Sequence, residues 1–492
     1  MARGALKGLD EVLEEIPFGR FHVITVLLCG FAYVVDGFVT NLVGFTSDCI
    51  GEEFTLEESY IAKFPTVLFC GAIIGGFVFA QVADGYGRRF AMLFSQMWIT
   101  VSILFTSLLA TPGSLLFGYF LIGFGTGGAG ITFDYISEVV APNLRVLCFA
   151  VQCIFPVSTL IVSLLGWWIL GSGGTWRTLM QAVSIPMTTI FAVSYFVLPE
   201  SARWLLDQHE VDKAEGQVMV YAKMNGTHLD SFSFTRGFYK DTQREEQENE
   251  GISFSGVDDS TGTSAKLSKK GDGNKEDDES TFAYRIAEFS RKVEGIFTDP
   301  EMRHSIILMG YILFNSLFSK YAAVFLQARL LESTPGSDDT VVATCNFDFA
   351  EYLLSAPAEF LAALLVVFTT DWQGRRWSMF TWAALVALFS LTLSQSTENS
   401  SIADIALLGM RFAAFGSEVA SWTPATELFN TQYRATAFSI CFVMSRVGAM
   451  LAATLVDSTL STETICVVVL SGSVLSAIAA LMVKETKGEH MD

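Results

Sequence analysis

The stretch Ala80-Gln-Val-Ala-Asp84-Gly-Tyr-Gly-Arg88-Arg89 returns as Val367-Phe-Thr-Thr-Asp371-Trp-Gln-Gly-Arg375-Arg376, 287 positions later. Each copy closes a long apolar segment and stands just before the next one. An acidic residue, a glycine and two arginines that recur between apolar segments indicate a membrane protein built of two related halves. In such repeat architectures the binding site lies between the halves.

The composition supports insertion into a membrane. Of the 492 residues, 51% are hydrophobic and 17% are charged, whereas soluble domains carry roughly 25% charged residues. A membrane-spanning helix needs about 20 predominantly apolar residues. Twelve segments meet this need, at residues 21–43, 62–82, 90–110, 114–136, 147–170, 178–198, 303–328, 350–370, 377–395, 402–424, 436–456 and 464–483. The first segment lacks a small-residue cleavage site after it, so we interpret it as a retained helix.

The second half repeats the first at a further point. Glu138 and Arg145 return as Glu427 and Arg434, 289 positions later. The sequence therefore predicts an all-α membrane protein with twelve transmembrane helices in two pseudo-symmetric six-helix halves. The predicted domains are the N-terminal half at 1–198, a linker at 199–302 and the C-terminal half at 303–492.

The linker has two parts of different character. Residues 201–223 are predicted to be helical. Between Lys240 and Glu279 there are twelve acidic and six basic residues among Ser, Gly, Asn and Thr. Such a segment has too little apolar surface to fold, which predicts a disordered acidic tether near 240–280.

Charge in the loops predicts the orientation, because Lys and Arg favour the cytoplasmic side. Loops after even-numbered spans carry the bases Arg88, Arg89, Arg145, Arg203, Arg375, Arg376, Arg434, Lys484 and Lys487. The opposite loops carry the acids Asp48, Glu52, Glu53, Glu57, Glu58, Asp338, Asp339 and Asp348. Both termini and the linker are therefore predicted to be cytoplasmic. Cys49 and Cys345 both fall in the outer loops, where a disulfide is an open option.

These motifs resemble the major facilitator superfamily. The repeated Asp-x-x-Gly-Arg-Arg loops, Pro199-Glu-Ser-Ala-Arg203 and Lys484-Glu-Thr-Lys-Gly488 carry the resemblance. Within the superfamily, Ala358-Glu359-Phe360 and Ser445-Arg446-Val-Gly448 resemble the organic-ion and synaptic-vesicle-related branch, which is sugar-porter-like. Phe314-Asn-Ser-Leu-Phe-Ser-Lys320-Tyr321 stands where sugar porters have a Gln-rich signature, which argues against a hexose site. The resemblance implies the major facilitator fold, with spans 1, 4, 7 and 10 lining a central cavity.

Charged side chains inside the spans are the candidate binding residues. Each costs roughly 2.5–3.5 kcal/mol to insert, so such residues usually face a cavity or a partner. The six candidates for substrate or proton binding are Asp36, Lys320, Glu359, Arg411, Glu418 and Arg446.

We assign these candidates by charge. Asp36 and Glu359 are predicted to hold a proton or a cationic group, and Arg446, together with Lys320, an anionic group. For Asp36 the alternative is pairing with a nearby base, and for Lys320 it is snorkelling toward a membrane surface. Arg411 and Glu418 lie about two turns apart on one helical face, and pairing with each other or with neighbours is their alternative.

A second set of charges is predicted to form a cytoplasmic gate, with ion pairs that tie the halves together when the inner side is closed. Its members are Asp84, Arg88, Arg89, Glu138, Arg145, Glu200, Arg203, Asp371, Arg375, Arg376, Glu427 and Arg434. Exposed pairs contribute about 0–1 kcal/mol each, a weakness that suits a latch. The alternative is that some of them cap helices or serve as orientation signals.

The expected function is secondary active transport of a small organic ion by alternating access. The resemblance links a base in span 11, here Arg446, to anionic substrates, whereas span 8 has the acid Glu359. An anion or zwitterion that moves with a proton fits both signs, and a cation stays open.

Alternatives to this function are a sugar or phosphate carrier, or a non-transporting membrane receptor of the same fold. An enzyme is not expected, because the sequence has no nucleophile–base pair, metal cluster or phosphate-binding loop. The expected partners are a small solute, H+ and membrane lipid, with no nucleic acid, metal or cofactor, and the chain is expected to be a monomer. The plasma membrane or an intracellular vesicle membrane is the expected location.

Overall fold

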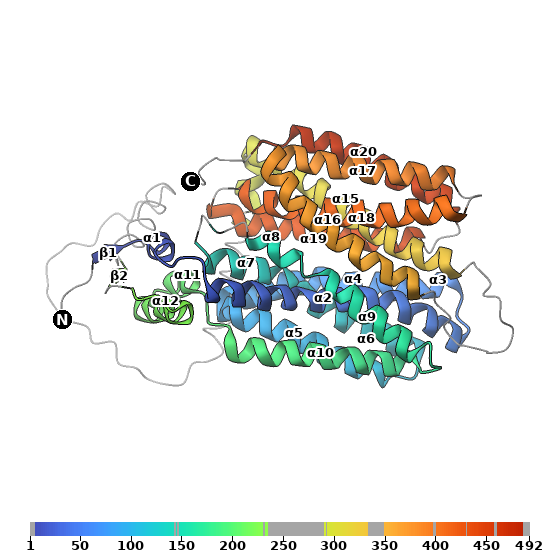
Figure 1. The fold of residues 1–492 in the computed structure, drawn as a ribbon, viewed down its shortest axis with the longest axis horizontal. Helices are drawn as coiled ribbons and strands as arrows, with labels where there is room; N and C mark the ends of the chain where they lie inside the picture. Colours follow the sequence, from blue (N-terminus) through green and yellow to red (C-terminus); the bar gives the residue numbers. More distant parts are fainter. Residues whose placement is uncertain are drawn as a thin grey trace.

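The computed structural model describes residues 5–141, 144, 147–229, 232–234, 290–291, 293–332, 349–396, 400–429, 431–456 and 460–485. Long helices dominate this part of the chain and lie side by side in one bundle (Figure 1). The bundle helices of the N-terminal half are α2 (Arg20–Phe54), α4 (Lys63–Tyr86), α5 (Arg88–Ser107), α6 (Pro112–Thr126), α7 (Ile131–Val139), α8 (Leu147–Gln152), α9 (Pro156–Ile169) and α10 (Trp176–Val197). Those of the C-terminal half are α15 (Pro300–Glu332), α16 (Phe349–Gln373), α17 (Arg375–Gln395), α18 (Ser400–Glu427), α19 (Thr431–Val456) and α20 (Thr462–Met482).

The predicted spans correspond to these helices. Within the described residues, eleven helices are long and apolar enough to cross a membrane. The predicted span 402–424 lies in α18, whose 28 residues are long enough but include Asp404, Arg411 and Glu418. The fourth span consists of α6 and α7, joined by the short 3-10 helix η1 (Gly127–Gly130). The prediction of an all-α bundle of twelve spans is confirmed.

The helix contacts repeat between the halves. In the N-terminal half α2 packs on α9, α5 on α10 and α4 on α6. The equivalent helices of the C-terminal half make the equivalent pairs, α15 with α19, α17 with α20 and α16 with α18. The halves meet through α4 against α19 and α9 against α16, which are again equivalent contacts. The repeat in the sequence is therefore a repeat in packing.

A small module of short helices lies at one end of the bundle, which we call the linker end (Figure 1). It contains α1 (Leu9–Glu14), α11 (Ala202–Asp207) and α12 (Val211–Asn225), so the helix predicted at 201–223 is present as two pieces. Two three-residue strands, β1 (Ala5–Lys7) and β2 (Phe232–Phe234), pair in parallel, a small departure from the all-α prediction. The ring of Tyr221 stacks on Phe21 at 4.7 Å and fixes α12 to the start of α2.

Two predictions concern residues that the structure does not describe. The acidic tether near 240–280 lies outside the described residues. Cys49 is disulfide-bonded. Cys345, which the sequence suggests as its partner, lies outside the described residues.

Glycine decides how closely α6 can approach α4. A Cβ added at Gly123 would overlap the carbonyl oxygen of Leu68, so no larger residue fits without a shift of the backbone. A Cβ at Gly113, near the start of the same helix, would meet nothing within 4 Å. Small residues at such crossings let membrane helices pack backbone to backbone.

We expect Gly123→Ala to destabilise the protein by about 1–3 kcal/mol, because the helices must separate to admit the methyl group. Gly113→Ala is the matched control and should stabilise the helix by roughly 0.5–1 kcal/mol, the difference in helix propensity. Thermal unfolding of both purified variants checks this. Equal midpoints for the two variants would contradict the packing argument.

Candidate functional site

The six charged residues predicted inside the spans are all buried, and they form three ion pairs. Asp36 on α2 lies 3.3 Å from Arg446 on α19, measured from Oδ2 to Nη2. Lys320 on α15 and Glu418 on α18 are 2.7 Å apart, from Nζ to Oε2. The third pair joins Arg411 on α18 to Glu359 on α16 at 2.6 Å, from Nη2 to Oε1. None of the six side chains is more than 6% exposed.

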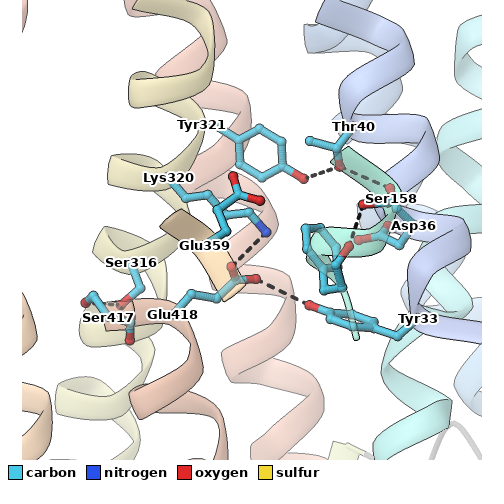
Figure 2. Close-up of polar contacts among 12 residues, drawn as sticks. Tyr33, Asp36, Thr40, Ser158, Ser316, Lys320, Tyr321, Glu359, Ser417 and Glu418 are labelled. Atoms are coloured by element: carbon cyan, nitrogen blue, oxygen red, sulfur yellow. Dashed lines mark hydrogen bonds and ion pairs between the residues drawn. The ribbon is translucent and has the colours of Figure 1, made fainter. Parts of the chain in front are cut away.

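Aromatic rings lie near the pair of Lys320 and Glu418, and Figure 2 shows Tyr321 and Tyr33 beside it. The Lys320 ammonium lies 4.0 Å from the ring centroid of Phe155, 5.2 Å from that of Phe415 and 5.8 Å from that of Tyr321. The contact with Glu418 is electrostatic in character, because Oε2 accepts no well-aligned hydrogen bond from the described residues. The alternative in which Lys320 snorkels to a membrane surface is wrong, since its side chain is 6% exposed and pairs inside the bundle.

The pair of Arg411 and Glu359 is extended by neutral polar side chains. Arg411 Nη1 donates a hydrogen bond to Gln327 Oε1 at 2.6 Å. Thr159 on α9 donates to Glu359 Oε2 at 3.0 Å, and Asn41 donates to Thr159 at 3.3 Å. Sequence reasoning missed Gln327, Thr159 and Asn41. In the sequence each is a neutral polar residue within an apolar span. Such residues are too common in membrane helices to single out these three.

Only one of the three pairs bridges the two halves. Asp36 is the one candidate from the N-terminal half, and the other five come from the C-terminal half. Those five comprise three bases and two acids, so Asp36 balances the surplus base. The Asp36–Arg446 distance is also the longest of the three. Arg446 Nε is buried and has no hydrogen-bond partner in the part of the chain that the structure describes.

Two tyrosines at equivalent positions of the repeat join the halves beside these pairs. Tyr33 on α2 and Tyr321 on α15 are 288 positions apart, between the repeat spacings of 287 and 289. The Tyr33 hydroxyl donates to Glu418 Oε1 of the other half at 3.3 Å. The Tyr321 hydroxyl lies 3.0 Å from Thr40 Oγ1, also of the other half (Figure 2). Sequence reasoning missed both tyrosines, although the repeat spacing could have identified them.

A second equivalent pair lies nearer the linker end. Phe133 on α7 and Trp422 on α18 are 289 positions apart and stack across the halves, with centroids 5.7 Å apart and planes at 12°. The ring of Trp422 also contacts Phe438 and Phe442 of α19, at 5.5 and 5.8 Å. The stack of Phe133 on Trp422 is therefore an aromatic contact between the halves, and rings of α19 support it from the side of Trp422.

The predicted gate residues make contacts within each half. Arg88 pairs with Asp84 and, at 3.0 Å, with Glu138. Arg203 pairs with Asp10 of the N-terminal segment. Arg145 lies outside the described residues, as do the side chains of Asp371, Glu427 and Arg434. Ion pairs that tie the halves together therefore stay a prediction.

The repeated loops also cap helices. Glu200 accepts a hydrogen bond from the backbone N–H of Arg89 at 2.9 Å, at the start of α5. In the second half Glu485 accepts from the N–H groups of Arg375 and Arg376 at 2.9 and 3.1 Å, at the start of α17. A carboxylate at a helix N-terminus accepts hydrogen bonds from the free amides and is attracted by the positive end of the helix dipole. Sequence reasoning assigned no role to Glu485, although the match with Glu200 was a signal.

Two related six-helix halves, with buried ion pairs of which one bridges them, have the architecture of a membrane transporter of the repeat type. The sequence model of the Major Facilitator Superfamily matches residues 29–453. The chain belongs to this superfamily, whose members are transporters and not enzymes, and the predicted resemblance is confirmed.

Relatives and solved structures agree with this family. The chain is 24% identical over 503 residues to the synaptic vesicle 2-related protein of Rattus norvegicus, covering 98% of the chain and 82% of the relative. It is 23% identical over 451 residues to organic cation/carnitine transporter 7 of Arabidopsis thaliana, covering 90% and 86%. The inward-open structure of the xylose transporter XylE from E. coli superimposes with a TM-score of 0.65 at 16% identity, over 96% of this chain and 98% of that one. The proton:xylose symporter XylE with bound 6-bromo-6-deoxy-D-glucose gives 0.67 at 16% identity, over the same shares of the two chains.

We expect Asp36→Asn to destabilise the protein by about 3–5 kcal/mol, because it leaves the Arg446 guanidinium buried without its counter-charge. Adding Arg446→Gln should recover about 1–3 kcal/mol of that loss, the coupling expected for residues in contact. The exposed pair of Lys213 and Glu210 is the control, and Lys213→Ala should change stability by less than about 1 kcal/mol. Thermal unfolding of the purified variants measures all three, and strictly additive losses at Asp36 and Arg446 would contradict a direct pair.

Proposed function

We propose that this protein transports a small organic anion or zwitterion together with a proton, by alternating access. The observation that carries the proposal is the ion pair of Asp36 and Arg446, which takes one charge from each half. The charge of the solute is the part that the named relatives leave open, because one of them is named for an organic cation. The argument therefore rests on the paired charges.

The ion pair restricts how the halves can move. If they rock apart at the site, Asp36 and Arg446 must separate, and an unpaired charge in such a place is strongly unfavourable. A proton on Asp36 removes its charge, and a carboxylate or similar anion on the solute replaces Asp36 at Arg446. With an anionic solute, the site then holds one extra proton and one extra negative charge, so its net charge is unchanged. Binding of the proton and the solute together therefore separates Asp36 from Arg446 at the lowest cost in free energy.

Arg446 suits the role of anion ligand. A guanidinium stays charged and presents several N–H groups in one plane, which match the two oxygens of a carboxylate. Its Nε is buried without a hydrogen-bond partner among the described residues, so one donor is free for a ligand. The proton-coupled symporter XylE has the same fold, which supports coupling in a carrier of this shape.

For the membrane location, we propose the plasma membrane or an intracellular vesicle membrane, with both termini in the cytoplasm. The bases in the loops at the linker end support this orientation. The relative named for synaptic vesicles supports a vesicle membrane.

Uptake into proteoliposomes tests the coupling. A panel of radiolabelled organic anions, zwitterions, cations, sugars and phosphate is offered with and without an inward proton gradient. We expect an anion or zwitterion to accumulate at least about tenfold more with the gradient, a gain equal to one pH unit for one coupled proton. Asp36→Asn should abolish that gain, because the variant has no group to protonate there, while Lys213→Ala should keep it.

Uptake that is unchanged by the gradient and by Asp36→Asn would overturn the coupling. Accumulation of only sugars or phosphate would overturn the assigned substrate class. Specific binding without any uptake would favour the receptor alternative.

A substitution at Arg446 separates charge from geometry. We expect Arg446→Lys to raise KM for the transported anion by roughly tenfold, because an ammonium keeps the charge but loses the planar pair of donors. The maximal rate should change less than KM, since the substitution weakens binding and not the proton site. Initial uptake rates over a range of solute concentrations check this. An unchanged KM would remove Arg446 from the site.

A further inference from the structure

The Lys320 ammonium occupies a site with the features of an organic-cation receptor. Aromatic faces surround it, with the Phe155 centroid at 4.0 Å, and the Glu418 carboxylate lies 2.7 Å away. Such aromatic cages with a nearby acid recognise ammonium ligands in many proteins. Here the cation is supplied by the chain itself. We call Phe155, Tyr321, Phe415 and Glu418 the cation cage.

The cation cage is built by both halves. Phe155, which directly precedes α9, belongs to the N-terminal half, whereas Tyr321, Phe415 and Glu418 belong to the C-terminal half. The Tyr33 hydroxyl from the N-terminal half orients Glu418 by donating to its other oxygen. Phe155 and Phe415 stack on each other across the halves, with centroids 5.6 Å apart. The cage therefore lies on the same interface as the Asp36–Arg446 pair, where a transported solute has to pass.

We propose that Lys320 determines charge specificity by occupying the cation cage with its own ammonium. Organic cations are excluded because their site is filled, and Arg446 is left as the group that accepts the solute. Lys320 then does not bind the anion, although its positive charge alone predicted that it would. This inference narrows the proposed substrate class from an anion or zwitterion to an anion, and its consequence for transport rests on the proposed function. The claim that the cage is a cation site does not depend on the proposed function.

Lys320→Ala tests the cage directly. The variant removes four non-hydrogen atoms, Cγ, Cδ, Cε and Nζ, which have the same skeleton as n-propylammonium. We expect n-propylammonium to bind the purified variant with a Kd of about 1 mM, the affinity of an efficient ligand of four atoms. At 20 mM it should then shift the folding equilibrium about twentyfold toward the native state, seen as a raised unfolding temperature.

The controls separate charge from cavity filling. n-Propanol has nearly the same size without the charge and should have little effect on Lys320→Ala. Lys320→Met fills the space of the lysine side chain as far as Cε and lacks only the ammonium, so neither ligand should find room there. The double variant Lys320→Ala/Glu418→Gln loses the acid and should lose most of the response. Equal stabilisation of Lys320→Ala by propanol and propylammonium, or by neither, would overturn the proposal.

Failure of Lys320→Ala to fold would itself be informative. Glu418 is then buried without its counter-charge, which is strongly destabilising. Propylammonium present throughout expression and purification should restore the yield of folded protein, and propanol should not. A yield that neither compound restores contradicts a cation cage.

Transport tests the specificity role. Proteoliposomes with Lys320→Ala should take up radiolabelled propylammonium at least about tenfold faster than those with the wild-type protein. A variant that binds propylammonium but still excludes it from uptake would contradict this role. Uptake by the wild-type protein that is unchanged by the proton gradient and by Asp36→Asn, with propylammonium binding to Lys320→Ala intact, would overturn the proposed function and leave the cation cage standing.

Discussion

The ion pair between Asp36 and Arg446 is the interaction on which the relation between the two halves depends. It is the one pair among the six candidates that takes a charge from each half, and both side chains are buried. Opposite charges in a medium of low polarity attract strongly, and separating them without new partners is costly. Any movement that opens the interface is therefore linked to whatever neutralises these two groups.

The hydrogen bonds between the halves beside these pairs are individually weak. Tyr33 reaches Glu418, Tyr321 reaches Thr40 and Thr159 reaches Glu359, each through one hydrogen bond. A hydrogen bond contributes about 0.5–1.5 kcal/mol net, more to a charged partner. Contacts within a half are of another kind, such as the backbone-to-backbone approach at Gly123 and the carboxylate caps of Glu200 and Glu485. Halves that are tightly packed inside, with hydrogen bonds between them that can break singly, suit rigid-body rocking.

The sequence predicted the helices and their repeat well, and the contacts between side chains poorly. Twelve spans and two halves were predictable, because apolar length and a repeated loop are local properties of the chain. The α18 helix shows the limit, since Arg411 and Glu418 lower its hydropathy and only their burial against partners explains its place in the bundle. The sequence could not decide whether the Lys320 side chain extends to a membrane surface or pairs inside the bundle. The position of a residue along its helix does not show which side chains of other helices lie next to it. Tyr33 and Tyr321 went unnoticed because tyrosine in an apolar span is unremarkable until its hydroxyl has a partner.

The sequence by itself determined that this is a membrane protein of two related halves, which charges lie within its spans, and the superfamily to which it belongs. Only the tertiary structure decided which acid meets which base. Asp36 and Arg446 are 410 positions apart, and the amino-acid pattern of an apolar span does not define how the helix is rotated about its axis. That rotation is set by packing against several other helices at once, so the pairing of charges and the cage around Lys320 emerge only when the two halves are assembled.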